Sequence, residues 1–290
     1  MRFSVCIPTL NARETWRDFS AALRRQSARP DEVIVIDSSS DDDTAGVAAR
    51  DGYEVITIAR EDFRHGATRQ LAANRTQSEV IVYLTQDALL ASDGAMAQLL
   101  RVFDDPTVGA AYGRQLPRHG AGPIEAFARI FNYPESSHTN SVKDIPARGF
   151  KTVFFSNSFG AYRMSALRQV GGFPPDANFG EDTVVAAQMV LAGWKIAYVA
   201  EAAVYHSHAH TLREEYRRYK AIGELHARQA WMLEKFGHVS GEGMRFLRSM
   251  IEYLAGRAPQ HIPEALAMVV CKFVGYRVGR RWQAAPRGPS

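Results

Sequence analysis

Short apolar segments that alternate with helical stretches fill the first third of the sequence and constrain its fold most strongly. Four segments, several of them rich in β-branched residues, predict strands: residues 2–8, 32–37, 54–59 and 80–85. Three helical stretches separate them: residues 11–26, 44–51 and 66–74. Strands that alternate with helices predict an α/β fold with a doubly wound, mostly parallel sheet flanked by helices.

The remainder of the chain predicts further elements in a less regular order. Helices are expected at residues 94–103, 124–132, 165–170 and 183–192, and strands at residues 108–114, 152–156, 195–199 and 203–206. Residues 117–151 are rich in His, Gly, Pro and Ser, and so long a segment in a compact domain is usually a functional loop or a mobile lid. Three charged or amphipathic helices are expected beyond residue 210: residues 213–236, 244–254 and 263–278.

Candidate ligand-binding residues lie at the carboxyl ends of three of the predicted strands. They are Pro8 and Thr9 at the first, Asp37 and Ser38 at the second, and Thr85, Gln86 and Asp87 at the fourth. Open α/β sheets bind ligands at the carboxyl ends of their strands, so we expect these residues to line one site. No Gly-x-Gly-x-x-Gly motif follows the first strand, which disfavours a dinucleotide site.

Asp87 is the candidate metal ligand. It ends a buried strand, where one or two carboxylates together with substrate phosphates commonly hold Mg²⁺. The alternative is a helix N-cap, a position for which Asp is equally well suited. The strand by itself does not separate the two interpretations.

A second acidic pair, Glu181 and Asp182, stands at the start of a predicted helix. Acidic side chains complement the helix dipole in a first turn, so capping is one interpretation. In the other, Asp182 is a general base that takes a proton from an attacking hydroxyl. Asp87 would then neutralise a leaving phosphate through a cation.

Basic and imidazole side chains supply further candidates. His206, His208 and His210 alternate, and on a strand this spacing would put all three on one face. One imidazole is compatible with Mn²⁺, so His206 is a candidate ligand, while surface or supporting roles are the alternative, more so for the other two. Zinc is disfavoured because no cysteine pair accompanies them. Arg69, near a helix N-terminus, suits a phosphate or nucleobase, or is simply an exposed arginine.

Charge is distributed unevenly along the 290 residues. Residues 211–290 hold fourteen Lys and Arg against seven Asp and Glu, a net charge of +7. The whole chain has a net charge of +4, which leaves −3 for the rest. A basic tail suggests an anionic partner, and a solvated helical face is the alternative.

Cysteine content and hydropathy bear on the compartment. Cys6 and Cys271 are far apart and predict no disulfide framework, which fits a reducing compartment. The apolar run at the start is too short for a signal peptide, and no stretch is long enough to span a bilayer. We therefore expect a cytoplasmic protein.

Several short motifs, in order and spacing, resemble those of the inverting glycosyltransferases of family two, which have the GT-A fold. The resemblance extends over roughly residues 3–210 and is carried by residues 5–11, 33–41, 66–69, 84–87, 171–173 and 181–182. Residues 63–69, 84–88 and 204–208 are similar to the rhamnosyltransferase branch. That branch uses dTDP-L-rhamnose and builds O-antigen and other surface polysaccharides.

The resemblance implies a role for each candidate residue. The residues that line the nucleotide and donor pocket would be Pro8, Thr9, Asn11, Asp37, Ser38, Arg69, Gln86 and Glu181. Asp87 matches the second acid of the family's Asp-x-Asp motif and would hold Mg²⁺ or Mn²⁺ with the diphosphate, completed by His206. Asp182 matches the acid of the Glu-Asp motif and would be the catalytic base.

The sequence also departs from the family pattern. Thr85 stands where the first acid of Asp-x-Asp is expected, which removes one carboxylate from the metal site. Ser38 stands where many relatives have a second acidic residue that contacts the base. Arg64 and Ala67 replace an expected Asn and Gly of the branch motif.

The resulting hypothesis has a GT-A catalytic domain at residues 1–210 and a basic α-helical extension at residues 211–290. The implied partners are a nucleotide-sugar donor and a glycan or lipid-linked acceptor, with no nucleic acid. The extension would rest on the inner face of a membrane, pack on the catalytic body or form a homo-oligomer contact. Two alternatives stay open: an inactive, sugar-nucleotide-binding or scaffolding subunit, and a nucleotidyltransferase.

Overall fold

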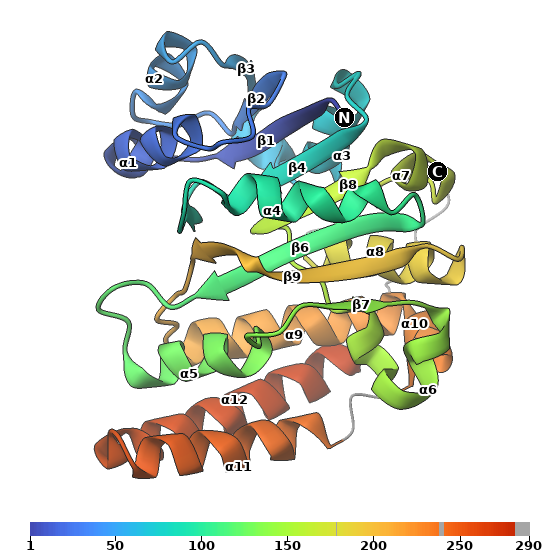
Figure 1. Ribbon diagram of the computed structural model, residues 1–290. Helices are drawn as coiled ribbons and strands as arrows, with labels where there is room; N and C mark the ends of the chain where they lie inside the picture. The colour runs from blue at the N-terminus through green and yellow to red at the C-terminus, as the bar shows by residue number, and fades with distance from the viewer. Residues whose placement is uncertain (178, 238–240, 282–290) are drawn as a thin grey trace, which may run out of the picture.

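One mixed sheet with helices on both faces organises the computed structural model (Figure 1), which describes residues 1–177, 179–237 and 241–281. The strand order is β3-β2-β1-β4-β8-β6-β9-β5, and β7 pairs with β9. The strands are β1 (Phe3–Thr9), β2 (Glu32–Asp37), β3 (Glu54–Thr57), β4 (Val80–Leu84), β5 (Leu89–Leu90), β6 (Val108–Leu116), β7 (His138–Asn140), β8 (Phe159–Arg163) and β9 (Lys195–Tyr205).

The α-helices cover the sheet and form a separate layer along one edge (Figure 1). They are α1 (Arg13–Arg24), α2 (Thr44–Arg50), α3 (His65–Arg75), α4 (Ala95–Arg101), α5 (Pro123–Asn132), α6 (Ile145–Arg148), α7 (Met164–Gln169), α8 (Glu181–Leu191), α9 (Leu212–Arg228), α10 (Ala230–Phe236), α11 (Glu242–Ala255) and α12 (Ile262–Arg280). Among the residues described, no helix is both long and apolar enough to cross a bilayer.

The first four strands form the predicted parallel unit. Strand β1 pairs in parallel with β2 and β4, and β2 pairs in parallel with β3. Alternate side chains of each strand enter different cores, since Val5 packs with α1, α2 and α4 while Cys6 packs with α3, α7 and α8. Both faces are therefore covered, which explains why these strands are continuous apolar runs in the sequence.

Antiparallel strand β8 joins this unit to the parallel pair of β6 and β9. The strand predicted at residues 152–156 is wrong: Gly149–Val153 is a 3₁₀ helix, and the strand begins at Phe159. Gly160 weakened the strand signal, but a side chain there would meet Phe155 at 2.8 Å and the Ser156 carbonyl oxygen at 3.0 Å. Close packing, which the sequence pattern does not report, requires this glycine.

Two other elements differ from their predictions. The strands expected at residues 195–199 and 203–206 are one strand, β9, whose register against β6 shifts between Gly113 and Arg114. The helix expected at residues 213–236 breaks at Gln229, because α10 turns Met232 and Phe236 into the core under the sheet. Within residues 117–151, α5 confirms the helix predicted at residues 124–132, whereas β7 and α6 were not predicted.

Close contact between α9 and α12 holds the C-terminal layer together. A Cβ atom at Gly275 would lie 2.4 Å from the Tyr216 carbonyl oxygen, and one at Gly279 would lie 2.0 Å from the Lys220 carbonyl oxygen. Helix α11 packs beside them through an apolar cluster shared with α5. The α9–α12 pair is therefore close-packed at its backbone and sensitive to one added methyl group.

We predict that Gly275→Ala lowers the free energy of unfolding by about 1–3 kcal/mol, because the new methyl group forces α9 and α12 apart. Chemical denaturation would measure the change. Gly243→Ala is the control, since nothing lies within 4 Å of its Cβ position in α11. An equal loss in both variants would contradict close helix contact as the cause.

Candidate active site

The loop after β2 is organised around the buried carboxylate of Asp37. Its Oδ1 accepts hydrogen bonds from Thr9 Oγ1 at 3.0 Å and Ser40 Oγ at 2.6 Å, and its Oδ2 accepts one from Ser40 N at 2.9 Å. The neighbouring Ser38 hydroxyl is buried without a hydrogen-bond partner among the described residues. The loop thus has a rigid base and one free buried hydroxyl.

Two further contacts bring the predicted pocket residues together. Asn11, which follows Pro8 and Thr9 at the end of β1, has a φ of 51° and accepts a hydrogen bond from Asp41 N at 2.8 Å. Gln86 binds the Leu10 backbone twice, accepting from its N at 2.7 Å and donating to its O at 3.0 Å. The ends of β1, β2 and β4 therefore meet at one edge of the sheet.

Asp87 lies with two histidines beyond the end of β9. Its Oδ2 is 3.4 Å from His206 Nε2 and 3.1 Å from His208 Nε2. One ligand atom of each of these three residues lies within 4.8 Å of the others. No helix begins beside Asp87, since α4 starts at Ala95, so the N-cap interpretation is wrong. The cluster could instead hold a metal ion.

The histidines do not share the face of a strand, because β9 ends at Tyr205. They converge through the bend of the chain beyond it, where the rings of His206 and His208 lie 4.8 Å apart. The sequence favoured a surface or supporting role more strongly for His208 than for His206. The alternating spacing of the histidines predicts a shared face only within a strand. Its contact with Asp87 makes His208 the third member of the cluster.

Gln115, at the end of β6, orients His206. Its Oε1 lies 3.1 Å from His206 Nδ1 and also binds Arg129, while its Nε2 donates to Ser156 Oγ at 2.8 Å. Because Oε1 only accepts, Nδ1 of His206 carries a hydrogen in this contact, and Nε2 is the ring nitrogen that faces Asp87. Metal-binding histidines are commonly oriented by such a contact.

Arg118 is a second residue that the sequence analysis did not identify. Its guanidinium donates to the Asp87 carbonyl oxygen at 2.7 Å and lies 3.4 Å from Asp87 Oδ2. Burial acts to raise the pKa of Asp87, but hydrogen bonds from His206 and His208 outweigh it and hold the pKa well below its usual range. Asp87 is therefore a carboxylate at neutral pH.

The donor atoms suit a divalent cation. One carboxylate oxygen and two imidazole nitrogens suit Mn²⁺ better than Mg²⁺, which prefers an all-oxygen shell. His208 supplies a donor in a site that lacks a carboxylate at Thr85. The side chains present thus fit a metal ion without the first acid of the family motif.

The second acidic centre begins α8. Gly180, with a φ of 72°, lets the chain turn into the helix, and Leu225 of α9 packs against it. Asp182 Oδ1 accepts from Thr183 N at 2.7 Å, and its Oδ2 accepts from Asn157 N at 3.2 Å. Asp182 remains partly accessible whereas Glu181 is buried, so Asp182 is the acid that can meet a substrate.

Glu181 belongs to a buried ion pair with Arg69. Arg69 Nη1 lies 3.1 Å from Glu181 Oε1, and both side chains are 5% exposed. Arg69 also donates to the His65 ring at 2.9 Å, and Asn157 Nδ2 donates to Glu181 Oε1 at 3.0 Å. Arg69 is thus not an exposed helix arginine, and its charge is balanced inside the protein.

The two acids of α8 have opposite pKa shifts. Burial and the negative charge of Glu181 raise the pKa of Asp182 to about 7. Burial also acts to raise the pKa of Glu181, but Arg69, His65 and Asn157 outweigh it and lower the pKa. Glu181 therefore stays ionised, while Asp182 can accept or release a proton near neutral pH.

Three residues that precede β8 connect the two acidic centres. Ser156 Oγ accepts from Gln115, the residue that orients His206. Asn157 donates to both acids of α8, and the Ser158 carbonyl oxygen accepts from Thr85 N at 3.2 Å, two residues before Asp87. Asp87 and Asp182 therefore flank one short segment, although they are 95 positions apart in sequence.

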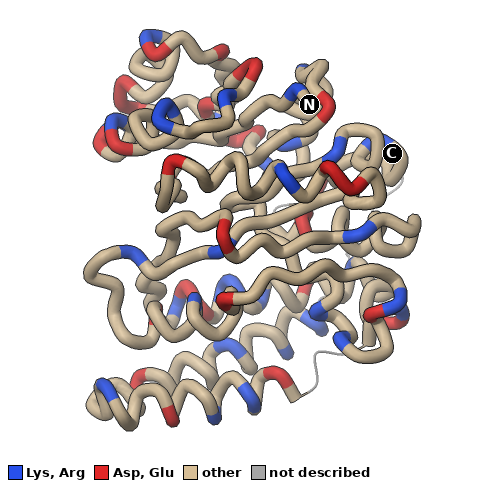
Figure 2. Tube along the Cα trace, in the orientation of Figure 1, with Lys and Arg blue, Asp and Glu red and all other residues tan. Residues whose placement is uncertain are grey.

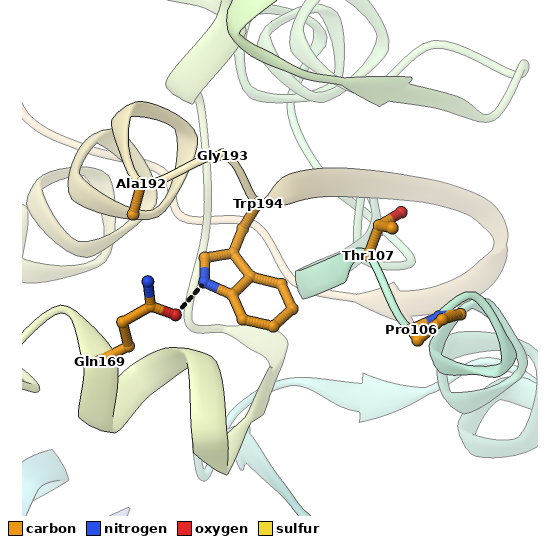
Figure 3. Close-up of a pocket in the computed structure, with 6 residues that line it drawn as sticks. All are labelled: Pro106, Thr107, Gln169, Ala192, Gly193 and Trp194. Carbon is orange, nitrogen blue, oxygen red and sulfur yellow. Dashed lines mark hydrogen bonds between the residues drawn. The ribbon is translucent and has the colours of Figure 1, made fainter.

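A hollow of about 300 Å³ lies elsewhere, where β6 and β9 begin (Figure 3). Trp194 donates from its indole nitrogen to Gln169 Oε1 at 2.9 Å across it, and Pro106 and Thr107 line the other side. Its lining includes no acidic or histidine side chain. This hollow therefore contains none of the candidate site residues.

We predict that Gln115→Met weakens cation binding by about 10–100-fold, because His206 loses the contact that orients it. Titration with Mn²⁺, followed by electron paramagnetic resonance, would measure the affinity. Gln98→Met on α4 is the control, since it lies outside this network. An unchanged affinity in Gln115→Met would exclude this supporting role.

Sequence comparison relates this chain to one family of enzymes. Residues 4–171 match the sequence profile of glycosyl transferase family 2. The chain is 44% identical over 288 residues to the O-antigen chain rhamnosyltransferase RfbN of Salmonella typhimurium, covering 99% of this chain and 92% of the relative. It is also 44% identical over 286 residues to WbaN of Salmonella anatum, covering 98% and 91%.

Solved structures share the fold at low sequence identity. A mannosyltransferase from Pyrobaculum calidifontis, in complex with GDP-Man and Mn²⁺, has a TM-score of 0.66 at 17% identity, with 98% of this chain and 88% of that chain covered. TarS residues 1–349 of S. aureus, in complex with UDP-GlcNAc, has a TM-score of 0.58 at 15% identity, with 97% and 90% covered. The profile match and the identity to full-length relatives show that this chain is a glycosyltransferase of family 2 with the GT-A fold.

Proposed function

We propose that the protein transfers L-rhamnose from dTDP-L-rhamnose, with inversion, to a hydroxyl of a lipid-linked O-antigen glycan. One observation carries the proposal: a partly accessible Asp182 with a raised pKa is linked through residues 156–158 to the Asp87 cluster. The choice of sugar rests on the 44% identity to O-antigen chain rhamnosyltransferases.

The nucleotide would bind at the ends of β1 and β2. Pro8, Thr9 and Asn11 would line its pocket, and the free Ser38 hydroxyl would reach the base or ribose. Asp37 would act mainly by holding this loop, because both of its oxygens already accept hydrogen bonds. Gln86 would keep the ends of β1 and β4 at a constant separation.

Asp87, His206 and His208 would hold Mn²⁺ or Mg²⁺. When bound there, the cation would neutralise charge on the diphosphate leaving group. His208 offsets the missing acid at Thr85, which weakens the main argument for an inactive scaffolding subunit. Turnover of the donor by the purified protein would exclude that alternative.

The transfer itself needs one base on the acceptor side. Asp182 would accept the proton of the acceptor hydroxyl as its oxygen attacks the anomeric carbon and the bond from that carbon to the diphosphate oxygen breaks. Attack from the face opposite the leaving group inverts the configuration. Glu181 would stay ionised and Arg69 would hold it in place, so that the charge next to Asp182 does not change during the reaction.

Location and domain organisation follow from the same proposal. The enzyme would act on the cytoplasmic side of the membrane, where a lipid-linked acceptor is presented. Residues 1–210 would form the catalytic domain and residues 211–290 a basic extension. Met232 and Phe236, which belong to this extension, are buried in the core cluster beneath the sheet.

We expect Asp182→Asn to lower kcat by at least about 100-fold, since the amide cannot accept the proton. Donor binding should survive, and a donor at 100 times its Kd should still stabilise the variant by about 2.7 kcal/mol in thermal unfolding. Asp18→Asn, at an exposed position of α1, is the control. A smaller loss of kcat would exclude Asp182 as the base.

The pH dependence tests the environment of the base. Asp182 must be deprotonated to act, so kcat/KM should fall as the pH drops below about 7. Glu181→Gln should move this inflection to lower pH, because it removes the negative charge that helps to raise the pKa of Asp182. A shift to higher pH would contradict the assignment.

Product analysis separates the remaining alternative. A glycosyltransferase releases a nucleoside diphosphate, whereas a nucleotidyltransferase would release pyrophosphate. Chromatography of the reaction with dTDP-L-rhamnose and acceptor should therefore show dTDP. Pyrophosphate in its place would overturn the proposed reaction.

A further inference from the structure

Helix α12 exposes an apolar face to solvent. Five of the fourteen large exposed apolar side chains in the described part of the chain lie on this helix: Leu266, Val270, Phe273, Val274 and Val278. Phe273 is 65% exposed and Val270 is 59% exposed. Their spacing of three and four residues places them on one side of the helix, which we call the α12 face.

The opposite side of α12 is already covered. Gly275 and Gly279 contact α9, while Ala265 and Val269 pack in the cluster shared with α5 and α11. A helix that is apolar all round is normally buried all round. The α12 face is uncovered among the described residues, so its composition indicates a partner.

Charge on α12 indicates which kind of partner. The last acidic residue is Glu264, and residues 265–281 contain only basic charges (Figure 2). Lys272 and Arg280 are used inside the molecule, by Glu215 and by the His226 carbonyl oxygen. Arg277 and Arg281 are exposed and lie on the same side of the helix as Phe273.

We propose that the α12 face is a docking surface for an anionic phospholipid bilayer, on which the helix lies flat. Apolar side chains would enter the acyl boundary while Arg277 and Arg281 meet lipid phosphates. The proposal deepens the proposed function and rests on it in one respect, the lipid-linked acceptor. It adds the surface by which the enzyme meets the membrane.

The position of α12 in the fold agrees with this role. Helix α12 packs along α9, and α9 begins at Leu212, four residues after His208 of the metal cluster. The Thr211 side chain caps α9 and fixes its start. A bilayer bound at the α12 face would therefore contact a helix that packs on α9, and α9 directly follows the metal cluster in the chain.

A second copy of the chain fits the α12 face less well. Such a partner would offer only Glu264 as an acid from this helix, and Glu264 already contacts His261 at 3.1 Å. Arg277 and Arg281 would then face few acidic side chains in a dimer formed through this helix. An anionic bilayer supplies negative charge at every position along the helix.

Flotation of the full-length protein with vesicles tests the proposal. One vesicle set is phosphatidylcholine, and the other contains phosphatidylglycerol as well. We expect binding to the anionic set only. The double variant Arg277→Glu, Arg281→Glu should lower the partition coefficient by at least about 25-fold, because the loss of each cation alone costs about fivefold.

The apolar contribution is tested separately by Phe273→Asp, which should lower binding to anionic vesicles by at least about tenfold. Val142→Asp and Arg25→Glu are matched controls, because both residues are exposed and lie outside α12. The controls should float like the wild type. All variants should keep their transfer activity towards a soluble acceptor glycan, since none lies in the active site.

Three outcomes would overturn the proposal. These are no binding to anionic vesicles, equal loss in the controls, or a concentration-dependent dimer that Phe273→Asp dissociates while vesicle binding is absent. The last would assign the α12 face to a second copy. If the wild type transfers sugar but does not float, only this inference fails; if it floats but transfers nothing, only the proposed function fails.

Discussion

The buried ion pair between Arg69 of α3 and Glu181 of α8 is the interaction on which the catalytic edge depends. Its two side chains lie 3.1 Å apart at 5% exposure, so neither charge has solvent to stabilise it. Removing one partner would leave an uncompensated charge beneath Asp182. The pair also sets the pKa difference between the two acids of α8, since Arg69 keeps Glu181 ionised and the charge of Glu181 raises the pKa of Asp182.

Residues 156–158, just before β8, connect the two acidic centres. Residues 156–158 reach Gln115 below the histidines, Thr85 near Asp87 and both acids of α8. They are held there by β8, which enters antiparallel between β4 and β6. The insertion of this strand brings the end of β4 and the start of α8 to the same edge of the sheet.

Prediction from sequence succeeded where a local pattern carries the signal. The continuous apolar segments of β1, β2 and β4 identify buried parallel strands, and Glu181 and Asp182 begin a clear helix. Prediction failed at β8, because Gly160 is required there by close packing that the sequence pattern does not report. It also failed at the break between α9 and α10, where the sequence contains no glycine or proline. Four residues belong to the candidate site only through contacts with residues 24 to 121 positions away in sequence: Asn157, Gln115, Arg118 and His208.

The sequence by itself determined the α/β class, the order of its first strands and the acids that a transfer reaction would need, because apolar periodicity and residue chemistry are local properties. Tertiary structure alone decided which of these groups meet. It paired Arg69 with Glu181, placed His208 beside Asp87 and left the α12 face uncovered by any other described residue. Such contacts depend on how the sheet closes, and the energy of a buried charge depends on neighbours that are distant in the chain.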